Sequence, residues 1–201
     1  FGVVISCIIG FTVGTLCFQN KNSASFMLGV CDIFQTFPSF VYLIPVMMLF
    51  GITDTSVLIA VIVYATIPAT RYTIEGLRSV PTALHDAATM SGVTKFQRLF
   101  KIEFPLAFPH MMLGLNQTIV FALFMVIIGA FIGTEDLGQY ILKALSDKNG
   151  AGIGLTLGLC VAFIGLIFDN LIRTWVDQRK KHLGIGSVSY THLTLPTKRI
   201  V

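Results

Sequence analysis

Five long apolar stretches constrain this chain more than any other feature of its sequence. They cover residues 1–18, 27–51, 56–77, 105–133 and 151–173. A helix needs about 20 mostly apolar residues to cross the hydrocarbon core of a bilayer. Charged residues make up only 12% of the sequence, against roughly 25% in soluble domains. Because so few charges cannot cover a water-facing surface, we predict an all-α membrane protein with about five transmembrane helices.

The polar connections between these stretches differ in charge. Basic residues collect after the first and third stretches and beyond the fifth, at Lys21, at Arg78, Lys95, Arg98 and Lys101, and at Arg173, Arg179, Lys180 and Lys181. Lysine and arginine concentrate on the cytoplasmic side of membrane proteins. We therefore expect these three segments to share the cytoplasmic side and the first visible residue to lie outside.

Other patterns predict how the helices bend and pack. Pro38 and Pro45 interrupt the second stretch, so we expect a kinked helix there. Gly10 and Gly14 have the small-xxx-small spacing that lets membrane helices approach closely. Residues 137–145 are too few to cross a bilayer, and their apolar spacing predicts a short amphipathic helix at the outer rim.

The insert between the third and fourth stretches, residues 79–104, is the main polar segment. Pro81 suits the first turn of a helix and Gly92 suits its end. Thr94 and Gln97 match a capping box that starts a second helix. The insert should therefore be a helix, a glycine turn and a helix. In the second helix we expect Phe96, Leu99 and Phe100 to pack and Lys95, Arg98 and Lys101 to face water or lipid phosphates.

The insert carries a long motif. It reads Asp86-Ala87-Ala88-x3-Gly92-x9-Ile102-x-Phe104-Pro105. This motif resembles the cytoplasmic loop of binding-protein-dependent ABC importers, which reads Glu-Ala-Ala-x3-Gly-x9-Ile-x-Leu-Pro. Asp replaces Glu and Phe replaces Leu. In that family the loop is a coupling helix held in a cleft of a separate ATPase subunit. The resemblance implies ATPase coupling by Asp86, Ala87, Ala88, Gly92, Ile102 and Pro105; an amphipathic helix lying on the bilayer is the alternative.

Four further runs resemble the glycine betaine/proline branch of this family, at residues 34–45, 104–109, 114–118 and 137–139. The similarity covers residues 1–182 and implies a permease domain of the type I importer (MetI-like) fold, in a bacterial or archaeal cytoplasmic membrane. The solute would be glycine betaine, proline betaine, carnitine or choline. The alternatives are a permease for methionine or a sulfonate-type solute, an ion-coupled secondary transporter, and a membrane scaffold without transport.

The resemblance also implies partners. These are a cytoplasmic ATPase subunit, an extracytoplasmic substrate-binding protein or fused domain, the lipid bilayer and a second permease copy, most simply in a homodimer; no nucleic acid is expected. The chain contains no Gly-x4-Gly-Lys-Ser/Thr motif. We therefore predict no catalytic residue and no enzyme activity, with ATP and Mg on the partner subunit. The histidines show no zinc spacing, so no metal site is predicted.

Several residues inside the stretches are candidates for the wall of a translocation path. Aromatic rings bind quaternary ammonium groups, which makes Phe37, Pro38, Phe40, Tyr42 and Met47 candidates, with core packing or lipid contact as the favoured alternative. Asn116 and Gln117 could line the path, but hydrogen bonding between helices is favoured. Asp169 and Arg173, four residues apart on one helix face, predict an ion pair.

The two ends of the sequence bound the domain. The chain opens at Phe1 inside an apolar run, so we expect residues 1–182 to be an N-terminally truncated permease domain. Residues 187–201 fit no membrane pattern and resemble a translated sequencing adapter, so we expect them to be non-native. A binding domain fused after about residue 183 stays an open alternative.

Overall fold

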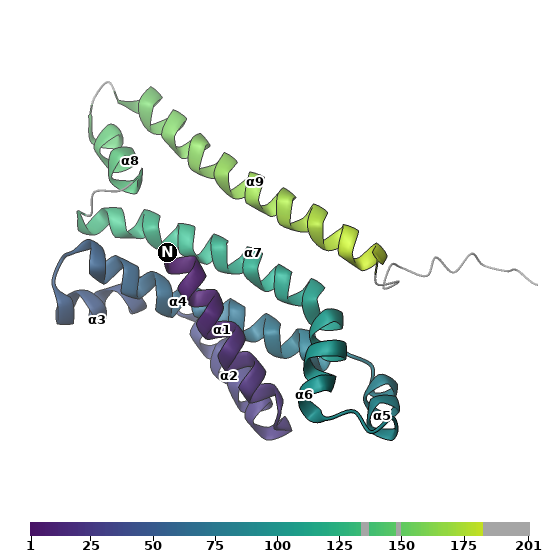
Figure 1. Ribbon diagram of the computed structural model, residues 1–201. Coiled ribbons are helices and arrows are strands. Elements are labelled where there is room, and N and C mark those ends of the chain that lie inside the picture. The colour runs from purple at the N-terminus through teal and green to yellow at the C-terminus, as the bar shows by residue number, and fades with distance from the viewer. Residues whose placement is uncertain (134–136, 148–149, 183–201) are drawn as a thin grey trace, which may run out of the picture.

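The structure is a computed structural model that describes residues 1–133, 137–147 and 150–182; the expected adapter-derived tail at 187–201 lies outside these residues. In the described part every regular element is a helix (Figure 1), which confirms the all-α prediction. In chain order they are α1 Gly2–Phe18, α2 Lys21–Thr36, α3 Phe40–Phe50, α4 Asp54–Arg78, α5 Thr82–Met90, α6 Lys95–Arg98, η1 Leu99–Glu103, α7 Phe104–Gly129, η2 Ala130–Ile132, α8 Leu137–Ser146 and α9 Ala151–His182.

Each of the five predicted stretches contains an apolar helix. Among the described residues, three helical segments have the length and composition of a membrane span on their own, Asp54–Arg78, Lys95–Gly129 and Gly152–Lys181, and the bent pair α2–α3 makes a fourth. The helix α1 is apolar but has 17 residues, just short of that length. The chain is thus a multi-pass membrane protein.

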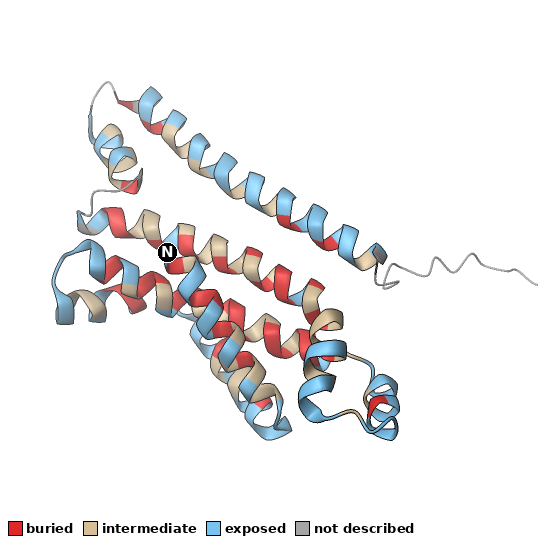
Figure 2. Ribbon diagram, viewed as in Figure 1, coloured by how far each residue is buried: buried red, intermediate tan, exposed pale blue. Residues whose placement is uncertain are grey.

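The helix α4 forms the centre of the bundle. Its 25 residues extend about 37 Å at 1.5 Å per residue, and α1, α2, α3 and α7 all pack against it. Ala60 and Ala65 of α4, Leu43 of α3 and Met125 of α7 are fully buried in the main core. Figure 2 shows this buried centre along α4 and α7.

Glycines set the distance between α1 and α4. A Cβ atom placed on Gly10 would lie 2.4 Å from the Cβ of Ala69, and one on Gly14 would lie 2.7 Å from the Cβ of Thr73. Real Cβ atoms do not come this close, so the two helices can pack at this distance only because both positions are glycine. The small-xxx-small prediction is confirmed.

The second predicted stretch is broken rather than gently kinked. The axes of α2 and α3 differ by 87°, and Pro38 lies in the break between them. Proline disfavours helical backbone in the residue before it, and Phe37 is extended, with φ −74° and ψ 136°. Pro45 lies inside α3 and does not end it.

The fourth stretch starts earlier than predicted. The helical backbone runs without interruption from α6 through the π-helical segment η1 into α7, so the helix begins at Lys95 and not near residue 105. Pro105 lies in the first turn of α7, as expected. The second helix of the insert is therefore continuous with α7.

The connections lie at two opposite ends of the bundle. The α1–α2 turn, the end of α4 and the α5–α6 insert are at one end, and the α3–α4 turn and α8 are at the other (Figure 1). The basic segments therefore share one end, as the charge pattern predicts. The helix α9 runs along α7 and returns to the basic end, and most of its residues are exposed in this chain (Figure 2).

Candidate functional site

The insert has the predicted helix–glycine turn–helix structure. Pro81 is the N-cap of α5, and Gly92 takes the left-handed backbone (φ +70°) that follows its end. The Thr94 hydroxyl accepts a hydrogen bond from the Gln97 amide N–H at 3.3 Å, and Gln97 Oε1 accepts one from the Thr94 amide at 3.2 Å. This capping box satisfies two amide groups at the start of α6, as the sequence predicts.

A buried carboxylate ties the two helices of the insert together. The side chain of Glu103 is 3% exposed, and its Oε1 accepts from Nε of Arg98 at 3.0 Å and lies 3.1 Å from Nδ1 of His85. Arg98 also reaches Oγ1 of Thr89 on α5 at 3.5 Å. We call His85, Arg98 and Glu103 the insert clamp. It joins α5, α6 and η1, and charged partners make such hydrogen bonds stronger than neutral ones.

The predicted coupling residues divide into two groups. Asp86, Ala87 and Gly92 are exposed, and Ala88 is buried, the one buried residue of α5. Ile102 and Pro105, half-buried, lie on η1 and α7. Asp86, Ala87 and Gly92 thus form a surface of short side chains that faces outward, whereas Ala88 is turned toward the rest of the chain. The second group belongs to the root where the insert joins the span.

Two predictions about the second helix need correction. Phe96 does not pack into the chain: it is 70% exposed and contacts Phe100, with ring centroids 4.4 Å apart. Phe100 is 51% exposed but also stacks on Phe104, with ring centroids 5.3 Å apart. Arg98 does not face water but turns toward Glu103. The reason is that α6 lies at the edge of the bundle, where only one helix face meets other residues. Leu99 does pack, against the small core around Leu77.

A groove of about 810 Å³ opens beside the insert. Its apolar floor includes Phe18 and Leu77, and its lining carries Lys21, Arg78 and Lys95 together with the Arg98–Glu103 ion pair. Arg78 also donates from Nη2 to the carbonyl oxygen of Lys21 at 2.9 Å, which joins the α1–α2 turn to the end of α4. The groove therefore has a net basic lining beside α5.

The predicted path residues lie around the break between α2 and α3. Phe37, Pro38 and Phe40 are exposed. Tyr42 is buried, and its hydroxyl donates to the carbonyl oxygen of Phe34. Met47 packs on the edge of the main core. The candidate path residues therefore divide into an exposed group (Phe37, Pro38 and Phe40) and a packed group (Tyr42 and Met47).

The polar residues of the fourth and fifth stretches meet between α7 and α9. Asn116 Nδ2 donates to Oδ1 of Asp169 at 2.6 Å, and Arg173 Nε donates to the same carboxylate at 2.8 Å. The predicted ion pair of Asp169 with Arg173 and the favoured interhelical hydrogen bond of Asn116 are both found. Gln117 is half-buried on α7.

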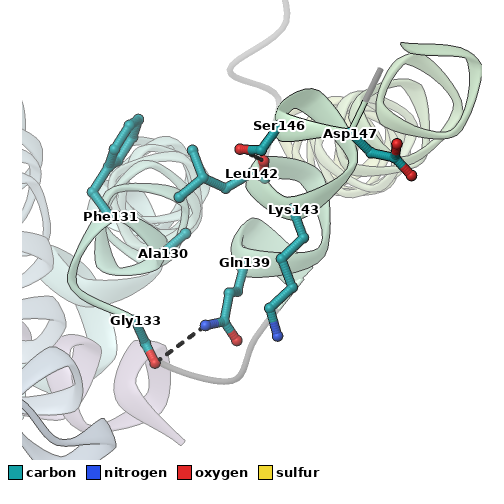
Figure 3. Close-up of a pocket in the computed structure, with 8 residues that line it drawn as sticks. All are labelled: Ala130, Phe131, Gly133, Gln139, Leu142, Lys143, Ser146 and Asp147. Carbon is teal, nitrogen blue, oxygen red and sulfur yellow. Dashed lines mark hydrogen bonds between the residues drawn. The ribbon is translucent and has the colours of Figure 1, made fainter. Parts of the chain in front are cut away.

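A second, shallower cavity of about 440 Å³ lies at the opposite end, where α8 folds over the end of α7. Gln139 and Lys143 of α8 and Ala130 and Gly133 after α7 line it, and Gln139 Nε2 donates to the carbonyl oxygen of Gly133 at 3.4 Å (Figure 3). This confirms a short helix at the rim, on the far side of the bundle from the insert.

Sequence reasoning missed the insert clamp and a second ion cluster. Arg71 lies 2.6 Å from Asp32 and 2.9 Å from Glu75. The spacing of four between Arg71 and Glu75 was a readable signal for that pair. The contacts of Asp32 and Glu103 with residues of other helices had no such signal. In the described residues no three His, Cys, Asp or Glu side chains gather as a metal site would require.

Comparisons with known proteins agree with this geometry. The family described as "Binding-protein-dependent transport system inner membrane component" matches residues 2–182. The trimethylamine N-oxide transport system permease protein TmoV of Pelagibacter ubique is 91% identical over 186 residues, which are 92% of this chain and 26% of that protein. The glycine betaine transport system permease protein OpuAB of Bacillus subtilis is 32% identical, covering 90% of this chain and 64% of that protein.

A solved structure of the MetNI methionine ABC transporter in an inward-facing conformation superposes with a TM-score of 0.77 at 19% identity, covering 89% of both chains. At this identity the likeness shows the fold alone, and it confirms the predicted MetI-like fold. The chain spans about a quarter of the length of the TmoV relatives, 26% and 28%.

Proposed function

This chain belongs to the family of binding-protein-dependent transport system inner membrane components, and from this premise we propose that it is part of the permease subunit of an ATP-driven importer. The subunit would move its solute by alternating access and carry out no hydrolysis itself. ATP and Mg would sit on a separate ATPase subunit. The relatives with curated names are transport permease proteins, which supports a transport role.

The observation that carries the proposal is the structure of the insert. The helix α5 presents Asp86 and Ala87 to water and buries only Ala88. Short side chains let the cleft of another subunit close on the helix backbone. The insert clamp joins α5 to the helix that continues into α7. Closure of an ATPase subunit around α5 would therefore move α7 as a rigid body and pass on to the bundle.

The solute we propose is a small methylated amine. The relative with 91% identity is named for trimethylamine N-oxide, and relatives at 32–36% identity are named for glycine betaine, carnitine or proline betaine. These solutes share a nitrogen that carries methyl groups and a positive charge. Trimethylamine N-oxide is therefore the first candidate, and the osmoprotectants predicted from the sequence, glycine betaine, proline betaine, carnitine and choline, come next.

The partners follow from the same reading. We infer a cytoplasmic ATPase on the insert, an extracytoplasmic binding protein or fused domain at the α8 end, and a second permease copy related by a two-fold axis. The basic end of the bundle would then face the cytoplasm of a bacterium or archaeon. The weakly buried helix α9 leaves ample surface for lipid and for the second copy (Figure 2).

Gly92 offers the sharpest test of the docking role. A Cβ atom there would meet nothing within 4 Å in this chain, and asparagine tolerates the left-handed backbone. Gly92→Asn should therefore leave the insert folded but add bulk to the surface that the ATPase grips. We expect the full-length variant, reconstituted with its ATPase and binding protein, to insert normally, bind the ATPase at least about tenfold more weakly and lose uptake of trimethylamine N-oxide.

Gly133→Asn is the matched control. Gly133 also has a positive φ (+89°) and open space around its Cβ position, but it lies at the α8 end of the bundle. This variant should bind the ATPase like the unaltered protein. Full ATPase binding and full uptake by Gly92→Asn would refute the proposed docking surface.

A further inference from the structure

The groove beside the insert lies where three membrane-spanning segments end. Lys21, Arg78 and Lys95 line it, and they are the end residues of the candidate spans that begin with α2, finish with α4 and begin with α6. The 25 residues of α4 extend about 37 Å, longer than the hydrocarbon core of about 30 Å but shorter than the roughly 40–45 Å that include the head groups. Arg78, its last residue, therefore lies at the depth of the lipid head groups.

The charges of these three cations have no carboxylate partner. Within the described part of the chain none of the three forms an ion pair, and Arg78 donates instead to the neutral carbonyl oxygen of Lys21 at 2.9 Å. Glu103 is the one carboxylate among the described residues of the lining, and it is already bonded to Arg98. With His85 neutral, the lining thus has a net charge of +3 and attracts an anion from outside the chain.

The groove also has a large apolar surface. Leu77 and Leu99 lie in its lining, together with Phe96, which is 70% exposed. The ring of Phe96 contacts that of Phe100, which stacks on Phe104 at the start of α7. These three rings continue the apolar surface from the groove along the membrane-spanning helix. Exposed apolar patches of this kind mark contact with a partner or with lipid.

The N-terminus of α5 adds hydrogen-bond donors to the same groove. Thr82, the first residue of α5, lines the groove. The N-cap residue is Pro81, and no side chain in the described part of the chain caps the helix. The first amide groups of α5 therefore have no side-chain partner and can bind an anion. The groove thus offers amide groups near its three cations.

These features together favour an amphipathic anion over a soluble one. The cations lie at head-group depth, and the exposed rings lead from them toward the hydrocarbon core. An acidic protein segment would match the cations but would leave Phe96 and Phe100 uncovered. The exposed coupling residues Asp86, Ala87 and Gly92 do not line the groove, so the proposed docking surface for the ATPase is separate from it. Basic pockets between membrane helices bind the head groups of anionic lipids.

We propose that the groove binds an anionic phospholipid such as phosphatidylglycerol. The phosphate lies among Lys21, Arg78 and Lys95, and an acyl chain lies along Phe96 and Phe100. Because Lys95 belongs to the insert and the other two cations belong to the bundle, the bound lipid joins these two parts. The inference goes beyond the proposed function, since it needs neither ATP nor a transported solute.

Native mass spectrometry of the full-length protein tests the site. The protein, stripped of lipid in detergent, would be titrated with phosphatidylglycerol or with zwitterionic phosphatidylcholine. Each basic residue near an anionic lipid surface is worth about fivefold in affinity. We expect Lys21→Gln and Lys95→Gln each to weaken phosphatidylglycerol binding about fivefold, and the double variant about 25-fold, with phosphatidylcholine binding unchanged. Unchanged phosphatidylglycerol binding in the double variant would overturn the proposal.

Lys180→Gln combined with Lys181→Gln is the matched control. These two residues lie on the last turn of α9, which returns to the basic end of the bundle (Figure 1), but they do not line the groove. The control removes as much charge as the double variant of the groove, and it should bind phosphatidylglycerol like the unaltered protein. Equal weakening by both pairs would overturn the proposal, since binding would then depend only on the total charge of this end.

Two further measurements identify the occupant. Glycerol phosphate carries the phosphate without acyl chains, so it should not displace phosphatidylglycerol; displacement at an equal concentration would show a site for a soluble anion and overturn the proposal. Purified ATPase subunit, added to the lipid-bound protein, should leave the lipid in place. Release of the lipid would show that the ATPase covers the groove and would equally overturn the proposal.

Discussion

The insert clamp makes a quantitative prediction for Glu103→Gln. Both bonds of the clamp end on Oε1 of Glu103, from Arg98 at 3.0 Å and His85 at 3.1 Å. Glutamine keeps the shape and an acceptor oxygen but removes the charge. The helix α5 buries only Ala88, so few apolar contacts hold it against the rest of the chain. The clamp should therefore set how tightly α5 is docked.

The size of the effect follows from the two bonds. A hydrogen bond to a charged group contributes about 1.5–3 kcal/mol and a neutral one about 0.5–1.5 kcal/mol, so each bond loses about 1 kcal/mol and the two together up to about 2 kcal/mol. Arg98 and His85 are 23% and 36% exposed, and water can solvate them once the charge is gone. We therefore expect local opening of α5 to become easier by about 1–2 kcal/mol, or about 5- to 30-fold.

Hydrogen–deuterium exchange in lipid nanodiscs would measure this directly. The amide of Ser91, which donates to the Ala87 carbonyl at 3.0 Å, reports opening at the end of α5, and it should exchange about 5- to 30-fold faster in Glu103→Gln. Amides around Met111, buried in α7, should not change. Asp86→Asn is the control, since Asp86 is an exposed acid on the same helix.

Two results would refute this reasoning. The first is unchanged exchange of α5 in Glu103→Gln, which would mean that other contacts hold the helix. The second is an equal acceleration in Asp86→Asn, which would mean that any loss of negative charge on the insert loosens α5.

Two further predictions concern packing between spans. Gly10→Ala should lower the free energy of unfolding in detergent by about 1–3 kcal/mol, because the new Cβ would lie 2.4 Å from the Cβ of Ala69. Gly158→Ala is the control, since a Cβ at Gly158 would meet nothing within 4 Å. Equal stability of the two variants would contradict the close contact between α1 and α4. Asn116→Leu should lower the free energy of unfolding by about 1 kcal/mol, because it removes the hydrogen bond to Asp169. Gln117→Leu should have a smaller effect in the same unfolding assay. A larger effect of Gln117→Leu would contradict the role of the Asn116–Asp169 bond.

Local features of the insert were readable from the sequence because their causes lie within a few residues. The capping box needs only Thr94 and Gln97, three positions apart, and the turn needs only a glycine that accepts a positive φ at Gly92. The break near Pro38 is equally local, although its angle of 87° was not predicted. The apolar stretches were readable because membrane thickness sets their length.

The same local reasoning failed for side chains whose surroundings come from other helices. Phe96 looks like a core residue in the sequence, yet its side chain is 70% exposed in this chain. Arg98 looks like a surface residue, yet it turns inward because the buried carboxylate of Glu103 lies beside it. Neither outcome follows from residue type or from spacing along one helix.

The sequence alone determined the membrane class, the approximate position of each apolar helix, the helix–turn–helix insert and the likeness to importer permeases, since all of these depend on composition, local backbone preference and a linear motif. Tertiary structure alone decided which polar groups meet: Glu103 with His85, Asp32 with Arg71, and Asn116 with Asp169. The reason is that these contacts depend on how helices are rotated and spaced, and that arrangement is set by close packing of α1, α4 and α7.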